Sequence, residues 1–166
     1  MKEFRSIGAF TRHLERLAAL GEGVGHHIVA ESTKTIQKAA QTKVGHYQES
    51  VGPFPDWAPL AESTKEDRVR HGYTADNPLL RDGTLRDSYT TAQDGAHGAV
   101  GSAEDVALMQ EVGTSRIPPR PVLGPAAIES KSAIATRAGN TLIAWISGIH
   151  WKRAPQFLKS PTPGND

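Results

Sequence analysis

Prolines and glycines separate two helix-prone outer segments of this chain from a middle in which long helices are disfavoured. Eight of the eleven prolines fall between residues 53 and 125, and proline breaks helix interiors because it lacks a backbone donor. Before them, apolar residues recur at steps of three and four, which predicts one face of a helix: Ile7, Phe10, Leu14 and Leu17. Glycines 21, 23 and 25 favour a bend or a helix end. A second helix is predicted over about 26–48, either separate or continuous with the first.

The middle begins with a connector and a short helix. Residues 51–59 hold three prolines around Phe54 and Trp57, which predicts an ordered connector pinned by its aromatic side chains. Ser63 and Glu66 have the spacing of a capping box, in which each side chain accepts from a backbone amide at the start of a helix. This helix is predicted to stop at Gly72.

A hairpin is predicted next. Residues 88–92 are rich in hydroxyl, β-branched and aromatic side chains, and Asp94-Gly95 is a strong turn signal before a returning strand over 97–102. Residues 103–112 have helical spacing, and 115–125 form a proline-rich loop that carries Arg116 and Arg120.

A final helix is predicted from Pro125, which suits a first helical turn. Its expected apolar stripe is Ile134, Ala138, Leu142, Trp145 and Ile149. The prediction is therefore an α+β fold with a long N-terminal helix, a small antiparallel sheet built on the hairpin, and a C-terminal helix packed on it. We expect one domain over 1–150 and an extended tail over 151–166, where prolines recur.

Composition argues against several functional classes. The net charge is +1 and there are no cysteines, so a strongly basic DNA-binding surface, disulfides and thiolate chemistry are not indicated. The N-terminus has no signal-peptide pattern, and the longest apolar stretch is too short to span a bilayer. The seven histidines lack ligand-like spacing, and the glycine-rich stretches lack the Lys-Ser/Thr of a phosphate loop. We predict no catalytic, cofactor or metal site.

Five carboxylates in the middle of the chain could in principle supply a hydrolytic pair: Asp82, Asp87, Glu104, Asp105 and Glu111. Each has a local structural explanation in a turn, at a strand start or on a helix. A hydrolase is therefore only a distant third reading of this chain.

Four short motifs occur in a fixed order: Trp57-Ala-Pro-Leu60 with Ser63-Thr64, then Leu80…Gly83-Thr-Leu85…Ser88, then Glu111-Val-Gly-Thr114, then Ile117-Pro-Pro-Arg-Pro-Val-Leu-Gly124. Together they resemble the Mu-type virion morphogenesis proteins of tailed bacteriophages. They are more distantly similar to the lambda-type minor tail protein Z family. The similarity covers about residues 57–128.

The resemblance implies a non-enzymatic structural subunit of the virion, made in the host bacterial cytoplasm. It would form a ring, of six copies, in the neck or at the head-proximal end of the tail, completing the tail and joining it to the head. Its partners would be copies of itself and neighbouring neck, tail-terminator or tail-tube proteins, with passive contact to DNA in the lumen and no membrane. Candidate interface residues are Arg116, Ile117, Arg120, Val122 and Leu123 in the loop, and Trp151 and Phe157 in the tail; arginine is enriched at interfaces.

The main alternative is a stand-alone nucleic-acid-binding protein. Its binding surface would use basic residues of the predicted long helices: Lys34, Lys38, Lys43, Lys131 and Arg137. A solvated helix face explains the same residues. Steep salt dependence of duplex binding would distinguish this alternative from a neck subunit.

Overall fold

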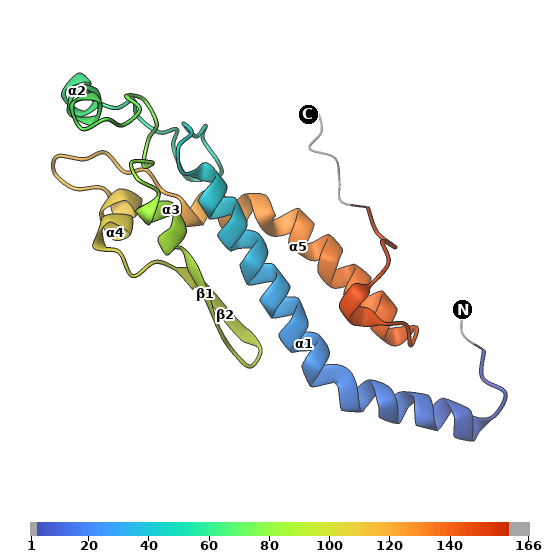
Figure 1. The fold of residues 1–166 in the computed structure, drawn as a ribbon. Coiled ribbons are helices and arrows are strands. Elements are labelled where there is room, and N and C mark those ends of the chain that lie inside the picture. Colours follow the sequence, from blue (N-terminus) through green and yellow to red (C-terminus); the bar gives the residue numbers. More distant parts are fainter. Residues whose placement is uncertain (1–2, 160–166) are drawn as a thin grey trace. The chain divides into compact units, whose positions relative to one another are not determined.

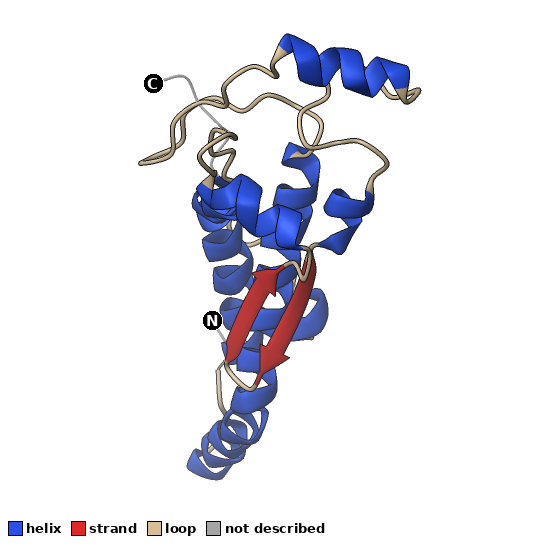
Figure 2. Cartoon of the chain, turned by 90° about the vertical axis from the view of Figure 1, so that its left-hand side faces the viewer, coloured by secondary structure: helices blue, strands red, loops and turns tan. Residues whose placement is uncertain are grey.

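The computed structural model describes residues 3–159. In order, the elements are α1 (Ile7–Lys43), α2 (Glu62–Arg70), α3 (Thr84–Ser88), β1 (Thr90–Asp94), β2 (His97–Gly101), α4 (Asp105–Val112), α5 (Leu123–Ile146) and the 3-10 helix η1 (Trp151–Arg153). Figure 1 labels these elements, and Figure 2 shows the two antiparallel strands among the helices. The predicted α+β class is confirmed, with its long N-terminal helix, its two-stranded antiparallel sheet and its packed C-terminal helix.

Several boundaries differ from those predicted. The first helix is continuous through Gly21, Gly23 and Gly25 and bends in its first half (Figure 1), and it ends at Lys43 instead of near 48. The N-cap of α2 is Ala61, with no side-chain cap bond. The predicted capping box is therefore wrong, because the helix starts before Ser63. The predicted stop at Gly72 is confirmed by its positive φ of 78° after the C-cap.

The chain divides into two compact units. The first unit contains the described parts of 1–32, 93–98 and 131–166, and the second contains 33–92 and 99–130. In the second unit, the core contains six buried side chains from the end of α1 and the residue after it, the connector, the residue before β1, the residue before α5 and the first turn of α5: Ala40, Val44, Trp57, Tyr89, Val122 and Ala126. The predicted pinning of the connector is confirmed, because Trp57 is buried in this core.

Helix α1 closes the core of the second unit with polar contacts. Lys43 is only 5% exposed; its Nζ lies 2.7 Å from Glu129 Oε2 on α5 and donates to Gln48 Oε1 at 3.0 Å. Gln37 Nε2 donates to the carbonyl of Tyr89 at 2.7 Å. The buried ammonium is thus satisfied by a carboxylate and an amide oxygen, as burial of a charge requires.

In the first unit, α1 packs with the end of α5 and the segment after it. Gly21 presents its Cα to the indole of Trp145, and Gly23 to that of Trp151, so small residues give the two rings a flat surface. His13 Nε2 lies 3.1 Å from the carbonyl of Ile146. These contacts give Gly21 and Gly23 a packing role within the helix, whereas nothing lies within 4 Å of a Cβ placed at Gly25.

The segment after α5 folds back in its described part, where an extended tail was expected. Asn140 is buried, and its amide forms two hydrogen bonds with the backbone of Leu158, at 2.6 Å to the N–H and 3.2 Å to the carbonyl. A side-chain amide that bonds both backbone groups pins that residue as a strand partner would. The expected extension over 160–166 lies outside the described residues.

Candidate assembly interface

Glu111, near the end of α4, caps the N-terminus of α5. Its carboxylate accepts from the backbone amides of Val122 at 2.7 Å, Leu123 at 3.1 Å and Gly124 at 3.3 Å. The first amides of a helix have no partner within the helix, and its dipole favours negative charge at this end. One side chain therefore fixes α4, the proline-rich loop and α5 in a single arrangement.

The burial of Tyr89 depends on the same region. Loss of hydration raises the pKa of the Tyr89 phenol to about 12, and the negative charge of Glu111 contributes to this shift. The ring is 1% exposed and belongs to the core. The carboxylate of Glu111 and the neutral phenol thus lie within electrostatic range of each other at the base of the loop.

The first half of the loop is a tight turn that projects outward. Gly113 has φ of +75°, and a Cβ there would lie 2.9 Å from the backbone nitrogen of Pro119. Thr114 Oγ1 accepts from the amides of Arg116 at 3.2 Å and Ile117 at 3.1 Å. The Gly-Thr of the third motif is therefore a turn-forming pair that leaves Arg116 exposed at the tip.

The second half of the loop is buried. Arg120 is 4% exposed, and its Nη2 donates to the carbonyls of Ala58 at 2.9 Å and Pro59 at 3.3 Å. Trp57 Nε1 donates to the carbonyl of Pro121 at 3.1 Å. The first and fourth motifs thus hold each other, which explains why Trp57 and the Pro-Arg-Pro run occur together in one chain.

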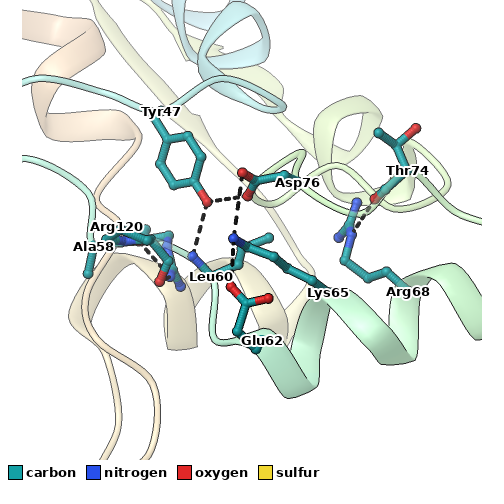
Figure 3. A network of polar contacts seen from close by, with 10 residues as sticks. Tyr47, Ala58, Leu60, Glu62, Lys65, Arg68, Thr74, Asp76 and Arg120 are labelled. Carbon is teal, nitrogen blue, oxygen red and sulfur yellow. Dashed lines mark hydrogen bonds and ion pairs between the residues drawn. The ribbon is translucent and has the colours of Figure 1, made fainter.

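A network of polar contacts fixes the start of α2 to Tyr47, in the segment that follows α1, and to Asp76 (Figure 3). Tyr47 Oη donates to Asp76 Oδ1 at 2.5 Å and accepts from the amide of Leu60 at 3.0 Å. Lys65 Nζ lies 3.0 Å from Glu62 Oε1 and 3.8 Å from Asp76 Oδ2. The hydrogen bond with Glu62 raises the pKa of Lys65. These contacts position the connector that carries the carbonyl partners of Arg120.

Helix α4 presents its apolar side chains to solvent. Val106, Leu108, Met109 and Val112 are 49%, 65%, 47% and 66% exposed. Ala107 is buried, while Gln110 and Glu111 are half-buried on the inner side. The amphipathic orientation expected of a surface helix is therefore reversed. An apolar outer face held in place by a polar inner anchor is typical of an interaction surface.

The predicted interface residues do not all lie on this surface. Arg116 is exposed and Ile117 is half-buried at the tip. Arg120 and Val122, however, are 4% and 0% exposed, and Leu123 packs on the core. Arg120 and Val122 are thus enclosed within the chain, and Leu123 is partly buried against the core. The assignment of these three is corrected to a structural one, because the capped end of α5 draws the loop inward.

The two tail candidates belong to the first unit. Trp151 is half-buried, with its ring 5.4 Å from that of His27, and Phe157 is 43% exposed. Phe157 therefore remains accessible, whereas Trp151 has its partners within the chain. The start of α1 adds further exposed apolar side chains in this unit: Ile7, Phe10 and Leu14, at 85%, 45% and 46%.

The basic residues of the alternative reading are partly engaged. Lys43 is buried against Glu129, and Arg137 lies 3.8 Å from Glu31 across α1 and α5. Two of the five proposed cations therefore neutralise carboxylates of this chain. No observation on the described residues specifically favours a nucleic-acid surface.

The carboxylates considered for hydrolysis have local roles. Asp82 accepts from the amide of Thr84 at 2.9 Å, and this bond lowers the pKa of Asp82. Asp87 pairs with Arg86 at 2.7 Å, which lowers the pKa of Asp87. Between residues 3 and 159, no group of three or more His, Asp or Glu side chains is placed to hold a metal ion. None of the helices in that range is long and apolar enough to cross a bilayer.

Sequence reasoning missed two features of this site. The capping role of Glu111 was not predicted, although a Glu before a Gly-Thr turn and a new helix is a usable signal. The exposure of Leu108 was also missed, because the helical spacing of residues 103–112 indicated a helix without showing which side of it would be covered. No family model, curated protein or solved structure matches the chain.

Proposed function

We propose that this chain is a structural virion protein of a tailed phage. It forms a ring in the neck or at the head-proximal end of the tail, completes the tail and joins it to the head. The four ordered motifs support this setting through their resemblance to virion morphogenesis proteins. The exposed apolar face of α4 carries the assembly part of the proposal.

The magnitude of this surface suits a subunit contact. Full burial of a Val, Leu or Met side chain contributes about 1.5–3 kcal/mol. Four such side chains, each roughly half exposed, would contribute about 3–6 kcal/mol when covered, before the cost of association is subtracted. Because Glu111 holds α4 rigidly, little conformational entropy is lost on docking.

A genetic and biochemical experiment tests the proposal. Particles from a phage that lacks this gene should contain filled heads and separate tails, and purified protein should restore joining, as seen by negative-stain imaging. The variant Leu108→Glu should fail to restore joining while retaining its helical circular dichroism. Normal infectious particles without the gene would overturn the proposal.

A matched control separates the α4 surface from a general effect of added charge. Val69 on α2 is 60% exposed, so Val69→Glu places the same charge on another exposed apolar position. We expect Val69→Glu to restore joining. Equal failure of both variants would remove the special role assigned to α4.

A further inference from the structure

The end of α5 and the residues after it form a second exposed apolar surface, in the first unit. Leu142 and Ile146 lie four residues apart on one side of α5 and are 39% and 57% exposed. Ile149, just beyond the helix, is 44% exposed. Together with Lys152 and Arg153 of η1, these side chains are called the C-terminal face.

The C-terminal face lies in a segment that carries only positive charge. Residues 130–159 contain five Lys and Arg and no Asp or Glu. Lys152 and Arg153 are exposed, and neither pairs with a carboxylate among residues 3–159. The ammonium of Lys152 lies 5.5 Å from the centroid of the Trp151 ring, a contact that leaves its charge uncompensated. A surface of this kind attracts a negatively charged partner that also offers apolar side chains.

The apolar face of α4 has the opposite charge around it. Glu104 precedes the helix and Asp105 is its first residue. Both are exposed, and neither has a cationic partner in the described part of the chain. Asp105 lies one turn before Met109, on the same side of the helix. Residues 44–129 contain thirteen Asp and Glu against seven Lys and Arg, a net charge of −6, and two of those seven cations are buried.

We propose that the C-terminal face of one copy of this chain docks on the apolar face of α4 of a second copy. The apolar side chains cover each other, and Lys152 and Arg153 pair with Glu104 and Asp105. Because two different surfaces meet, the contact is heterologous, and a series of such contacts closes into a ring where the rotation between copies allows it. The inference rests on the proposed function for the use of α4, whereas self-association of the isolated chain can be measured without it.

Charge distinguishes the C-terminal face from the other exposed apolar surface of the first unit. At the start of α1, Ile7, Phe10 and Leu14 are exposed. Residues 3–20 carry three Arg and two Glu, so this stripe has charges of both signs around it and complements an acidic helix less well. Duplex DNA would neutralise the cations of the C-terminal face but would leave its apolar side chains uncovered.

The small size of the two faces sets the expected strength of the contact. Three apolar side chains meet four, which is well below the roughly 20–30 residues a side of a standard interface. We therefore expect weak self-association that sedimentation equilibrium detects at about 0.5 mM chain but not at about 5 μM. Exposed ion pairs are screened by salt, so raising the salt concentration from about 0.05 to 0.5 M should weaken it.

The decisive experiment uses two full-length variants that each lack one face. Leu108→Glu disables the face of α4, and Ile146→Glu disables the C-terminal face. Each variant alone should remain monomeric at the highest concentration, whereas an equimolar mixture should form a 1:1 dimer that grows no further. Val69→Glu adds the same charge at an exposed apolar position outside both faces and should self-associate as the unmodified chain does. Circular dichroism checks that every variant keeps its helices.

A charge exchange tests the pairing of the flanking residues. Asp105→Lys should weaken self-association about fivefold at low salt, and adding Lys152→Glu with Arg153→Glu should restore most of it. The matched control adds Lys38→Glu with Lys131→Glu, the same change of charge at two exposed lysines outside both faces. This control should not restore the self-association of the Asp105→Lys chain.

Four results would overturn the inference: an unmodified chain that stays monomeric at the highest concentration, self-association of either single-face variant alone, a mixture of the two variants that stays monomeric, or equal rescue by both charge exchanges. Joining that depends on Leu108 but not on Ile146 would leave the proposed function standing and discard the inference. Self-association through both faces, together with normal particles from the deletion phage, would do the reverse.

Discussion

The capping carboxylate of Glu111 supports the sharpest prediction about stability. Glu111→Gln preserves the size of the side chain but removes its charge and one of its two acceptor oxygens. The three backbone N–H groups of Val122, Leu123 and Gly124 now lie 2.7–3.3 Å from the carboxylate, and each carboxylate oxygen accepts from two of them. The amide nitrogen that replaces one oxygen would face two of these N–H groups. Donors would then face donors at the start of α5.

The size of the effect follows from these contacts. A hydrogen bond to a charged group contributes about 1.5–3 kcal/mol, and a charge at a helix N-terminus about 0.3–2 kcal/mol depending on burial. The same amides carry both effects, so the two figures overlap. We expect the free energy of unfolding to fall by about 2–3 kcal/mol, which lowers Tm by roughly 5–10 °C in a chain of this size.

The assay is urea and thermal unfolding in a Trp145→Phe, Trp151→Phe background, in which fluorescence reports on Trp57. Trp57 is buried and donates to the carbonyl of Pro121, so its signal follows the second unit. The control is Glu104→Gln, an identical change at an exposed residue that makes no side-chain cap bond. A difference below about 0.5 kcal/mol between the two variants would refute the capping argument.

Three further predictions concern other positions. Gly25→Ala should raise the free energy of unfolding by about 0.5–1 kcal/mol, because nothing lies near the added methyl in α1. Gly124→Ala should lower the free energy of unfolding, because its methyl would overlap the ring of Phe54. Urea titration measures both changes. Arg120→Glu should unfold the second unit, since it buries a carboxylate among carbonyls, while Arg116→Glu at the exposed tip should change stability by less than about 0.5 kcal/mol. Burial raises the pKa of Tyr89 in the folded chain from 10.0 to about 12. The stability that the neutral phenol contributes is therefore complete below pH 10 and is lost as the pH rises towards 12. This alkaline loss of stability, at most about 2–3 kcal/mol, should be absent from Tyr89→Phe.

The predicted effect of Arg120→Glu reverses an expectation from the sequence. In a proline-rich loop, two arginines look equivalent, and both were assigned to subunit contacts. The fold separates them, because the capped start of α5 pulls the second half of the loop under the connector. Arg116 stays at the exposed tip, so only its substitution reports on an interface.

Local chemistry in the sequence determined where most elements begin and end. The hairpin turn at Gly95, the stop at Gly72 and the turn before α3 at Gly83 all require positive φ, and glycine adopts it without strain. Periodicity likewise predicted α1 and α5, since an apolar repeat of three and four residues is a property of a single segment. The sequence also carried the motifs whose resemblance suggests the virion setting.

Tertiary structure alone decided which faces of those helices are covered. The buried face of α5 is made of small and polar residues: Ala126, Ser130, Asn140, Thr141 and Ala144. In contrast, Leu142 and Ile149 of the predicted stripe are exposed. Periodicity shows that a helix has an apolar side, but close approach to α1 favours small residues. Tertiary contacts also decide which face of α4 is exposed. Glu111 on its inner side accepts hydrogen bonds from the backbone amides of Val122 and Gly124, which lie eleven and thirteen residues further along the chain.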